Sequence, residues 1–255
     1  AFHPTNPNQY YIGTDGGIFV TKDKGEIFQR LNRGFNVTQF YGVAFGSDGV
    51  VLGGTQDNGS FMLKNGTWTH VTGGDGMECI VDYSNANIMY SSSQYGNLYK
   101  STNGGASFNG ITGSIGDQGA WVSPYTLDPA NPNTIYLGYD QIWKSTNGGN
   151  TWNSIPGFNA GTNLKSLVVA QSNNNYIYAA TDNTIYRTTN AGTSWTNITN
   201  GLPSNVITYI SVHNTNPNIL WVSLSGYSNG QKVYKSTKSF SFNSHFLNNY
   251  QLTFN

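Results

Sequence analysis

Short runs in which apolar and polar residues alternate recur along almost the whole chain, separated by Gly, Asn, Asp and Pro. One stretch contains four such runs, at residues 41–45, 50–54, 60–64 and 67–71. A two-residue period between turn signals predicts β-strands, and no window shows the 3.6-residue period of a helix. The pattern predicts an all-β protein with four short strands in each unit of about 40 residues.

An eight-residue motif recurs in register with these runs. It reads Ser/Thr-x-Asp/Asn-x-Gly-x-x-Phe/Trp at residues 21–28, 101–108, 145–152 and 188–195. Successive copies are 80, 44 and 43 residues apart, and a degenerate copy ending at Trp68 divides the longest interval. A sixth copy begins at residues 235–237 and then loses the pattern. We therefore expect about six units, with irregular units at both ends of the chain.

The residue types of the motif indicate a structural turn. The Asp or Asn side chain accepts hydrogen bonds from backbone N–H groups of its own turn. The glycine permits a positive φ, and the closing aromatic residue packs between sheets. We assign this structural role to three sets of residues: Asp23, Asn103, Asn147 and Asn190; Gly25, Gly105, Gly149 and Gly192; Phe28, Phe108, Trp152 and Trp195.

The motif resembles the Asp-box, or BNR repeat, and its texture is closest to exported bacterial surface propellers. The chain also has a more distant similarity to xyloglucan-type glycosidases and to sortilin-type propellers. The resemblance implies a β-propeller of six or seven four-stranded antiparallel blades, with the Asp-box between the third and fourth strands. It implies a single propeller domain over residues 1–255, with incomplete terminal blades. Because the chain opens as if in the middle of a domain, we also expect a fragment of a larger secreted protein.

Composition narrows the choice of partners. Charged residues make up 9% of the chain, and 12 basic residues balance 12 acidic ones. Nucleic-acid binding requires a basic excess, so that class of partner is not expected. Cys79 is the single cysteine, which excludes an internal disulfide, and no apolar run is long enough to span a membrane. We expect a secreted or cell-surface bacterial protein; the sequence does not predict the oligomeric state.

Blade topology predicts where a site would form. In such blades the loops between the second and third strands share one face with the connections between blades. Seven acidic residues fall on that face, whereas most lysines fall near the Asp-boxes. The expected binding residues are these acids and the neighbouring aromatic residues: Asp57, Asp75, Glu78, Asp117, Asp140, Asp182, Tyr95, Trp121, Tyr125 and Tyr139. Carboxylates accept hydrogen bonds from sugar hydroxyls, and aromatic rings stack on sugars.

The seventh acid, Asp15, is the one candidate for catalysis. Its context, Thr-Asp-Gly-Gly, resembles the opening of the xyloglucan-type glycosidases, in which the matching Asp is a catalytic carboxylate. In that family the second carboxylate comes from a second propeller, which this chain does not contain. A glycosidase needs two carboxylates at a defined separation, and the sequence singles out no partner for Asp15.

Three functions remain open at this point. The chain is expected to be a binding module for a glycan or a protein, since no complete catalytic set is present. The first alternative is a xyloglucanase-like glycoside hydrolase or a fragment of one. The second is a structural spacer in a large surface protein. No cofactor and no Cys/His metal cluster are expected, although the acidic face offers oxygen ligands that suit calcium.

Overall fold

The structure is a computed structural model that describes residues 1–14, 17–31, 38–227, 232–238 and 241–243. These residues form six antiparallel sheets and, as the one helical element among them, the 3₁₀ turn η1 (Gln94–Gly96). The first sheet has three strands and the other five have four each. The predicted four-stranded unit is therefore present in five copies.

The strands of each sheet follow one another in the sequence, so that neighbours pair as hairpins. The first sheet contains β1 (Tyr10–Thr14), β2 (Gly17–Thr21) and β3 (Gln29–Arg30). The second contains β4 (Phe40–Phe45), β5 (Val51–Thr55), β6 (Gly59–Lys64) and β7 (Thr67–Thr72). The third contains β8 (Cys79–Val81), β9 (Met89–Ser93), β10 (Asn97–Ser101) and β11 (Asn109–Gly110).

The remaining three sheets repeat this plan. The fourth contains β12 (Tyr125–Asp128), β13 (Asn131–Gly138), β14 (Ile142–Ser145) and β15 (Asn153–Ser154). The fifth contains β16 (Ser166–Val169), β17 (Ile177–Ala180), β18 (Ile185–Thr188) and β19 (Thr196–Asn197). The sixth contains β20 (Ile207–His213), β21 (Asn216–Leu224), β22 (Val233–Lys238) and β23 (Ser241–Asn243).

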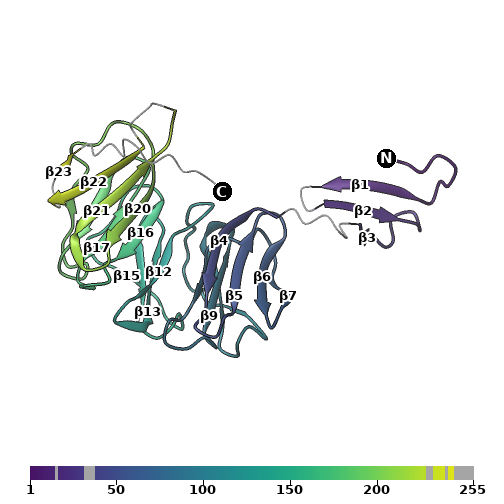
Figure 1. Ribbon diagram of the computed structural model, residues 1–255, viewed down its shortest axis with the longest axis horizontal. Helices are drawn as coiled ribbons and strands as arrows, with labels where there is room; N and C mark the ends of the chain where they lie inside the picture. The colour runs from purple at the N-terminus through teal and green to yellow at the C-terminus, as the bar shows by residue number, and fades with distance from the viewer. Residues whose placement is uncertain (15–16, 32–37, 228–231, 239–240, 244–255) are drawn as a thin grey trace, which may run out of the picture.

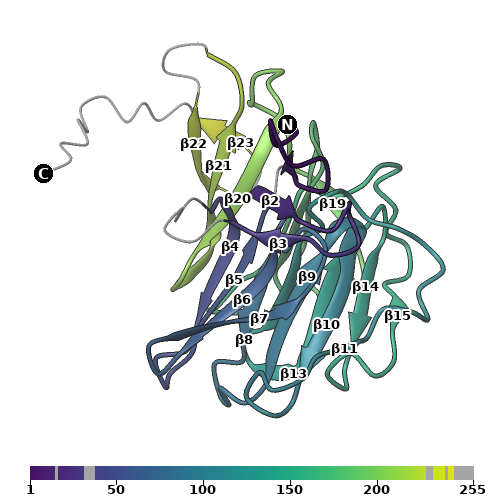
Figure 2. The ribbon, with the colours of Figure 1, turned by 90° about the vertical axis from the view of Figure 1, so that its right-hand side faces the viewer.

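Five of the sheets stack face to face in a curved array, whereas β1–β3 stands apart at one end (Figure 1). The first strands of the stacked sheets, β4, β8, β12, β16 and β20, lie along the inside of the array, where β4 neighbours β8 and β16 lies between β12 and β20. The view turned by 90° shows the hairpins of successive sheets running side by side (Figure 2).

Apolar side chains fill each gap between neighbouring stacked sheets. The gap between the third and fourth sheets, for example, buries Tyr90 and Leu98 against Leu127 and Ile135. Three further clusters fill the other gaps in the same way. A short strand with apolar residues on both faces is stable only when both faces are covered, and the stacking supplies that cover.

The recurring motif forms the same hydrogen bonds in all four copies. The Ser or Thr hydroxyl donates to the Asp or Asn Oδ1 and accepts from the glycine N–H. The same Oδ1 accepts from the backbone N–H four residues further on, at Ile27, Ser107, Thr151 and Ser194. Each turn is thus closed by its own side chains.

Lysine side chains connect neighbouring sheets at these turns. Lys64 Nζ lies 3.5 Å from the Gly104 carbonyl oxygen, and Lys100 Nζ lies 2.8 Å from that of Gly148. The Trp152 indole N–H also crosses a gap and donates to the Ile111 carbonyl at 2.7 Å. These bonds join the motif of one sheet to the preceding sheet.

The ends of the chain differ from the repeat in two ways. The first sheet lacks a fourth strand, as the sequence predicted. The sixth sheet, in contrast, is completed by β23 although the motif has been lost after residue 237. Backbone pairing with β22 needs no particular side chain, and the buried Phe242 anchors the strand.

Replacement of Asn147 by Ala should lower the free energy of unfolding by about 1 kcal/mol, because the Thr151 N–H loses its acceptor. Asn147→Asp keeps that acceptor and should stay within about 0.5 kcal/mol of the wild type. Asn150→Ala is the matched control, because Asn150 lies in the same turn and is likewise exposed, but its side chain makes no hydrogen bond to the described residues. Urea denaturation measures all three; equal losses for Asn147→Ala and Asn150→Ala would contradict the assignment.

Candidate binding site at the inner strand ends

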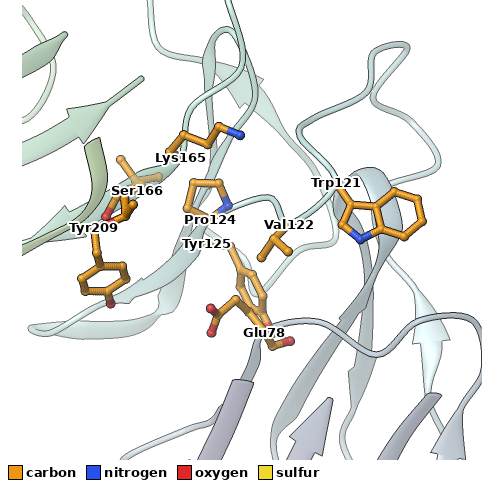
Figure 3. Close-up of a pocket in the computed structure, with 10 residues that line it drawn as sticks. Glu78, Trp121, Val122, Pro124, Tyr125, Lys165, Ser166 and Tyr209 are labelled. Carbon is orange, nitrogen blue, oxygen red and sulfur yellow. Dashed lines mark hydrogen bonds between the residues drawn. The ribbon is translucent and has the colours of Figure 1, made fainter. Parts of the chain in front are cut away.

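A cavity of about 370 Å³ opens where the starts of four inner strands converge. Its lining comes from the first residues of β12, β16 and β20 and from the segments just before β8, β12 and β16, which belong to four different sheets. The connections between sheets therefore share one face, as the topology predicted. The lining residues are Glu78, Trp121, Val122, Pro124, Tyr125, Lys165, Ser166, Leu167, Thr208 and Tyr209 (Figure 3).

Glu78 is the carboxylate of this cavity. Its backbone carbonyl is held firmly, since it accepts from the Ser92 N–H at 3.1 Å, the Ser92 hydroxyl at 2.9 Å and the Tyr125 hydroxyl at 2.9 Å. Among the described residues, no hydrogen bond reaches its carboxylate. Burial raises the pKa of Glu78 above its ordinary value of 4.5. A fixed backbone thus presents a half-buried carboxyl group with free hydrogen-bonding capacity.

Gly42 of β4 makes room for this side chain. A Cβ atom at residue 42 would lie 2.9 Å from both the Cα atom and Oε2 of Glu78. The carboxyl group therefore lies directly against the backbone of the neighbouring inner strand. Any larger residue at this position would displace it.

Two tyrosines flank Glu78 in different ways. Tyr125 is buried, and its hydroxyl is shared between the carbonyls of Glu78 and Tyr90, the latter at 3.2 Å. Tyr209 is largely exposed, and its ring stands on the opposite wall of the cavity (Figure 3). Partial desolvation and the charge of Glu78 raise the pKa of Tyr209. Tyr125 fixes Glu78, whereas Tyr209 offers a ring and a hydroxyl to a ligand.

An exposed aromatic pair forms the other rim. Trp121 and Tyr95 meet edge to face, with ring centroids 5.3 Å apart and an interplanar angle of 89°. Their backbones are also joined, because the Tyr95 N–H donates to the Trp121 carbonyl. Tyr95 has a φ of 64°, in the left-handed region, which directs its ring out of the hairpin toward Trp121. The indole is thereby held in place before any ligand arrives.

Lys165, the cationic side chain of the cavity lining, forms an ion pair with Asp182. Lys165 Nζ lies 3.7 Å from Asp182 Oδ1, and both side chains are almost half exposed. Water screens an exposed pair of this kind, so that it contributes little to stability. Its effect is to turn the ammonium group toward Asp182, away from Glu78 (Figure 3).

Two of the other expected acids meet at a different place. Asp75 Oδ1 accepts a hydrogen bond of 3.0 Å from the Asp57 N–H, and Asp57 adopts a φ of 60°. Both lie beside the second sheet, and neither lines the Glu78 cavity. The short span from Asp75 to Glu78 thus sends its two carboxylates to different surroundings.

The remaining expected residues are spread around the same face. Asp117 accepts from the Gln118 N–H at 2.7 Å. Asp140 follows β13, and its backbone carbonyl accepts from the Ala160 N–H. Tyr139 is buried, and its hydroxyl donates to the Gly96 carbonyl at 3.1 Å. Asp15 lies outside the described residues.

Sequence reasoning missed Tyr209 and Thr208. They come just before Ile210 in β20, at the positions that Lys165 and Ser166 hold before Leu167 in β16, and those two residues also line the cavity. Aligning the start of the sixth unit with the earlier ones would have found them. The described residues contain no group of three His, Cys, Asp or Glu side chains placed to hold a metal ion. Nor do they include a helix with the length and apolarity of a membrane span.

Known structures resemble this arrangement closely enough to define the fold. An ancestral GH74 enzyme superposes with a TM-score of 0.65 at 21% identity, over 91% of this chain and 35% of the enzyme. YCF48 bound to D1 peptide gives 0.56 at 11% identity, over 91% and 75%. The extracellular domain of the two-component system BT4673 from B. thetaiotaomicron gives 0.58 at 17%, over 92% and 32%. The chain has the β-propeller fold.

Sequence comparison agrees with this fold. The family model for sortilin and neurotensin receptor 3, Sortilin-Vps10, matches residues 140–253. A search of curated proteins finds no match. The predicted resemblance to Asp-box propellers is confirmed, and the sheets are propeller blades. The chain spans about a third of the length of the GH74 enzyme that it matches.

The raised pKa of Glu78 predicts a pH dependence of stability. The folded state binds the proton more tightly than the unfolded chain, so this group makes stability fall as the pH rises from about 4.5 through the folded-state pKa. Glu78→Gln should remove that fall and be the more stable protein at pH 7. Thermal unfolding across pH 3–8 measures it, with Glu26→Gln, an exposed glutamate, as the control. Parallel wild-type and Glu78→Gln curves would contradict the burial argument.

Proposed function

We propose that this propeller is a binding module for a neutral glycan, held in the cavity between Glu78, Trp121 and Tyr209. The observation that carries the proposal is the Glu78 carboxyl group, which has no hydrogen-bond partner among the described residues and points toward the side of the exposed Tyr209, in a cavity of about 370 Å³ that the exposed Trp121 also lines. Sugars offer the complementary chemistry, with hydroxyl groups for the carboxylate and C–H faces for the rings.

The charge distribution favours an uncharged ligand. The Lys165 ammonium group is paired with Asp182, and Glu78 is the one carboxylate among the described lining residues. Burial makes the ionised form of Glu78 less favourable and so raises its pKa. A hydroxyl group can donate to the carboxylate or accept from the protonated acid, so a sugar satisfies Glu78 in either form.

A hydrolase role, the alternative raised by the likeness to GH74 enzymes, requires more than this cavity holds. A glycosidase needs two carboxyl groups flanking the scissile bond. Among the described residues the lining supplies one, and Asp182, the partner of the lining residue Lys165, is engaged in that ion pair. The likeness itself, at 21% identity, concerns the fold.

The proposed setting is an exported protein. Its low content of charged residues and its single cysteine support this setting. So does the extracellular domain among the structurally similar propellers.

Replacement of Trp121 by Ala should weaken glycan binding about tenfold, equivalent to about 1.4 kcal/mol, because the stacking surface is lost. Glu78→Ala should weaken it by a similar factor, because a charge-assisted hydrogen bond is lost. Tyr83→Ala is the control, since Tyr83 is an aromatic residue of similar exposure that lies in the β8–β9 turn and does not line the cavity. Binding is measured by a glycan array followed by calorimetry with the best neutral oligosaccharide.

Three results would count against the proposal. One is the absence of binding to any neutral oligosaccharide at millimolar concentration. Another is binding that Trp121→Ala and Glu78→Ala leave unchanged. Release of reducing sugar that Glu78→Gln abolishes would instead establish the hydrolase.

A further inference from the structure

One face of the second blade is exposed where every later blade is buried. In each inner strand, two alternate residues face the preceding blade. In β8, β12, β16 and β20 these residues are 1–9% exposed: Cys79 and Val81, Tyr125 and Leu127, Leu167 and Val169, Ile210 and Val212. The same two positions in β4 are Val43 and Phe45, which are 45% and 74% exposed.

The strand register establishes that these positions correspond. Phe45 pairs with Val51 as Val169 pairs with Ile177, and Val43 pairs with Gly53 as Leu167 pairs with Ala179. Trp68, which ends the degenerate Asp-box, stands on the same face and is also exposed. The second blade therefore carries a complete blade-facing surface with no blade against it.

The matching half of that interface is exposed on β1–β3. In the fourth blade, Ile142 and Ile155 are 0% and 6% exposed and pack with Leu167 and Val169 of the next blade. In the fifth, Ile185 and Ile198 are 0% and 3% exposed. The corresponding residues of the first sheet, Ile18 and Leu31, are 49% and 46% exposed.

A shared hydrogen bond identifies this pair of positions. The Leu31 N–H donates to the Ile18 carbonyl, as Ile155 donates to Ile142 and Ile198 to Ile185. The first sheet thus has the local geometry of the other blades, although its Ile18 and Leu31 side chains are about half exposed. Both halves of one inter-blade interface are present in the chain and stand open to water.

We propose that β1–β3 docks onto the exposed face of β4–β7 of the same chain, with Ile18 and Leu31 against Val43 and Phe45. Removing these apolar side chains from water favours the docked arrangement. The sheet β1–β3 is already linked to β4 by a short connection of nine residues, the same length as the connection between β19 and β20. The other connections between blades range from 6 to 14 residues. A connection of this length permits the usual stacking within one chain.

In the present arrangement Arg30 Nη2 of the first sheet lies 2.6 Å from Asn58 Oδ1 of the second blade, and Phe19 lines a shared pocket with Phe61. This contact leaves Ile18, Leu31 and Phe45 exposed. Docking replaces a solvated polar contact by apolar burial of the kind that joins the other blades, and so extends an existing type of interface by one blade.

Hydroxyl-radical footprinting of the full chain tests the proposal, because it reports the solvent exposure of individual side chains. In the wild type, Phe45 should be oxidised about tenfold more slowly than in the urea-unfolded chain, given the 4–9% exposure of its four counterparts. Leu31→Asp should abolish most of this protection by placing a charge in the interface. Ile27→Asp, on the same sheet but in its Asp-box turn, should leave it intact.

Buried Tyr136 in the fourth blade reports whether each variant is folded, and Ile18→Asp replaces Leu31→Asp if the latter fails that check. The wild-type measurement is decisive without either variant. Oxidation of Phe45 at close to the unfolded rate would overturn the proposal. So would protection that appears only in a sample with the mass of a dimer, since the occupant would then be a second copy.

Discussion

The whole molecule depends on one constraint: a short strand with apolar residues on both faces must be covered twice. A single four-stranded sheet of this chain is too small to provide a core, and its two faces point in opposite directions. Stacking solves this by making each blade the cover of the next. The clusters between blades are accordingly the only cores that the described residues contain, and each joins two neighbours.

The candidate site is a consequence of the same stacking. Each inner strand alone offers one or two side chains at its start. Four of them brought side by side create a cavity with an acid, an indole and a phenol that are remote in the sequence. Glu78 illustrates the dependence: Ser92 of its own blade and Tyr125 of the next blade hold its backbone, and Gly42 of the preceding blade accommodates its carboxyl group.

The repeat made the fold readable from the sequence, because strands, turns and motif recur with a fixed spacing. It also predicted that the connections between blades share one face, and Glu78 and Trp121 line the candidate cavity there. What it could not supply was the direction of each side chain. Tyr125 and Tyr139 point inward, since their hydroxyls find backbone carbonyls, whereas Tyr209 points out. The separation of Asp75 from Glu78 likewise depends on backbone dihedrals that spacing does not encode.

The lysine contacts at the Asp-boxes have a consequence for the behaviour of the protein in different solutions. Lys64 and Lys100 direct their ammonium groups toward backbone carbonyl oxygens, and the ion pair between Lys165 and Asp182 is weak and exposed. Dissolved ions therefore have little to screen. The apolar clusters between the blades, rather than ion pairs, hold the described blades together.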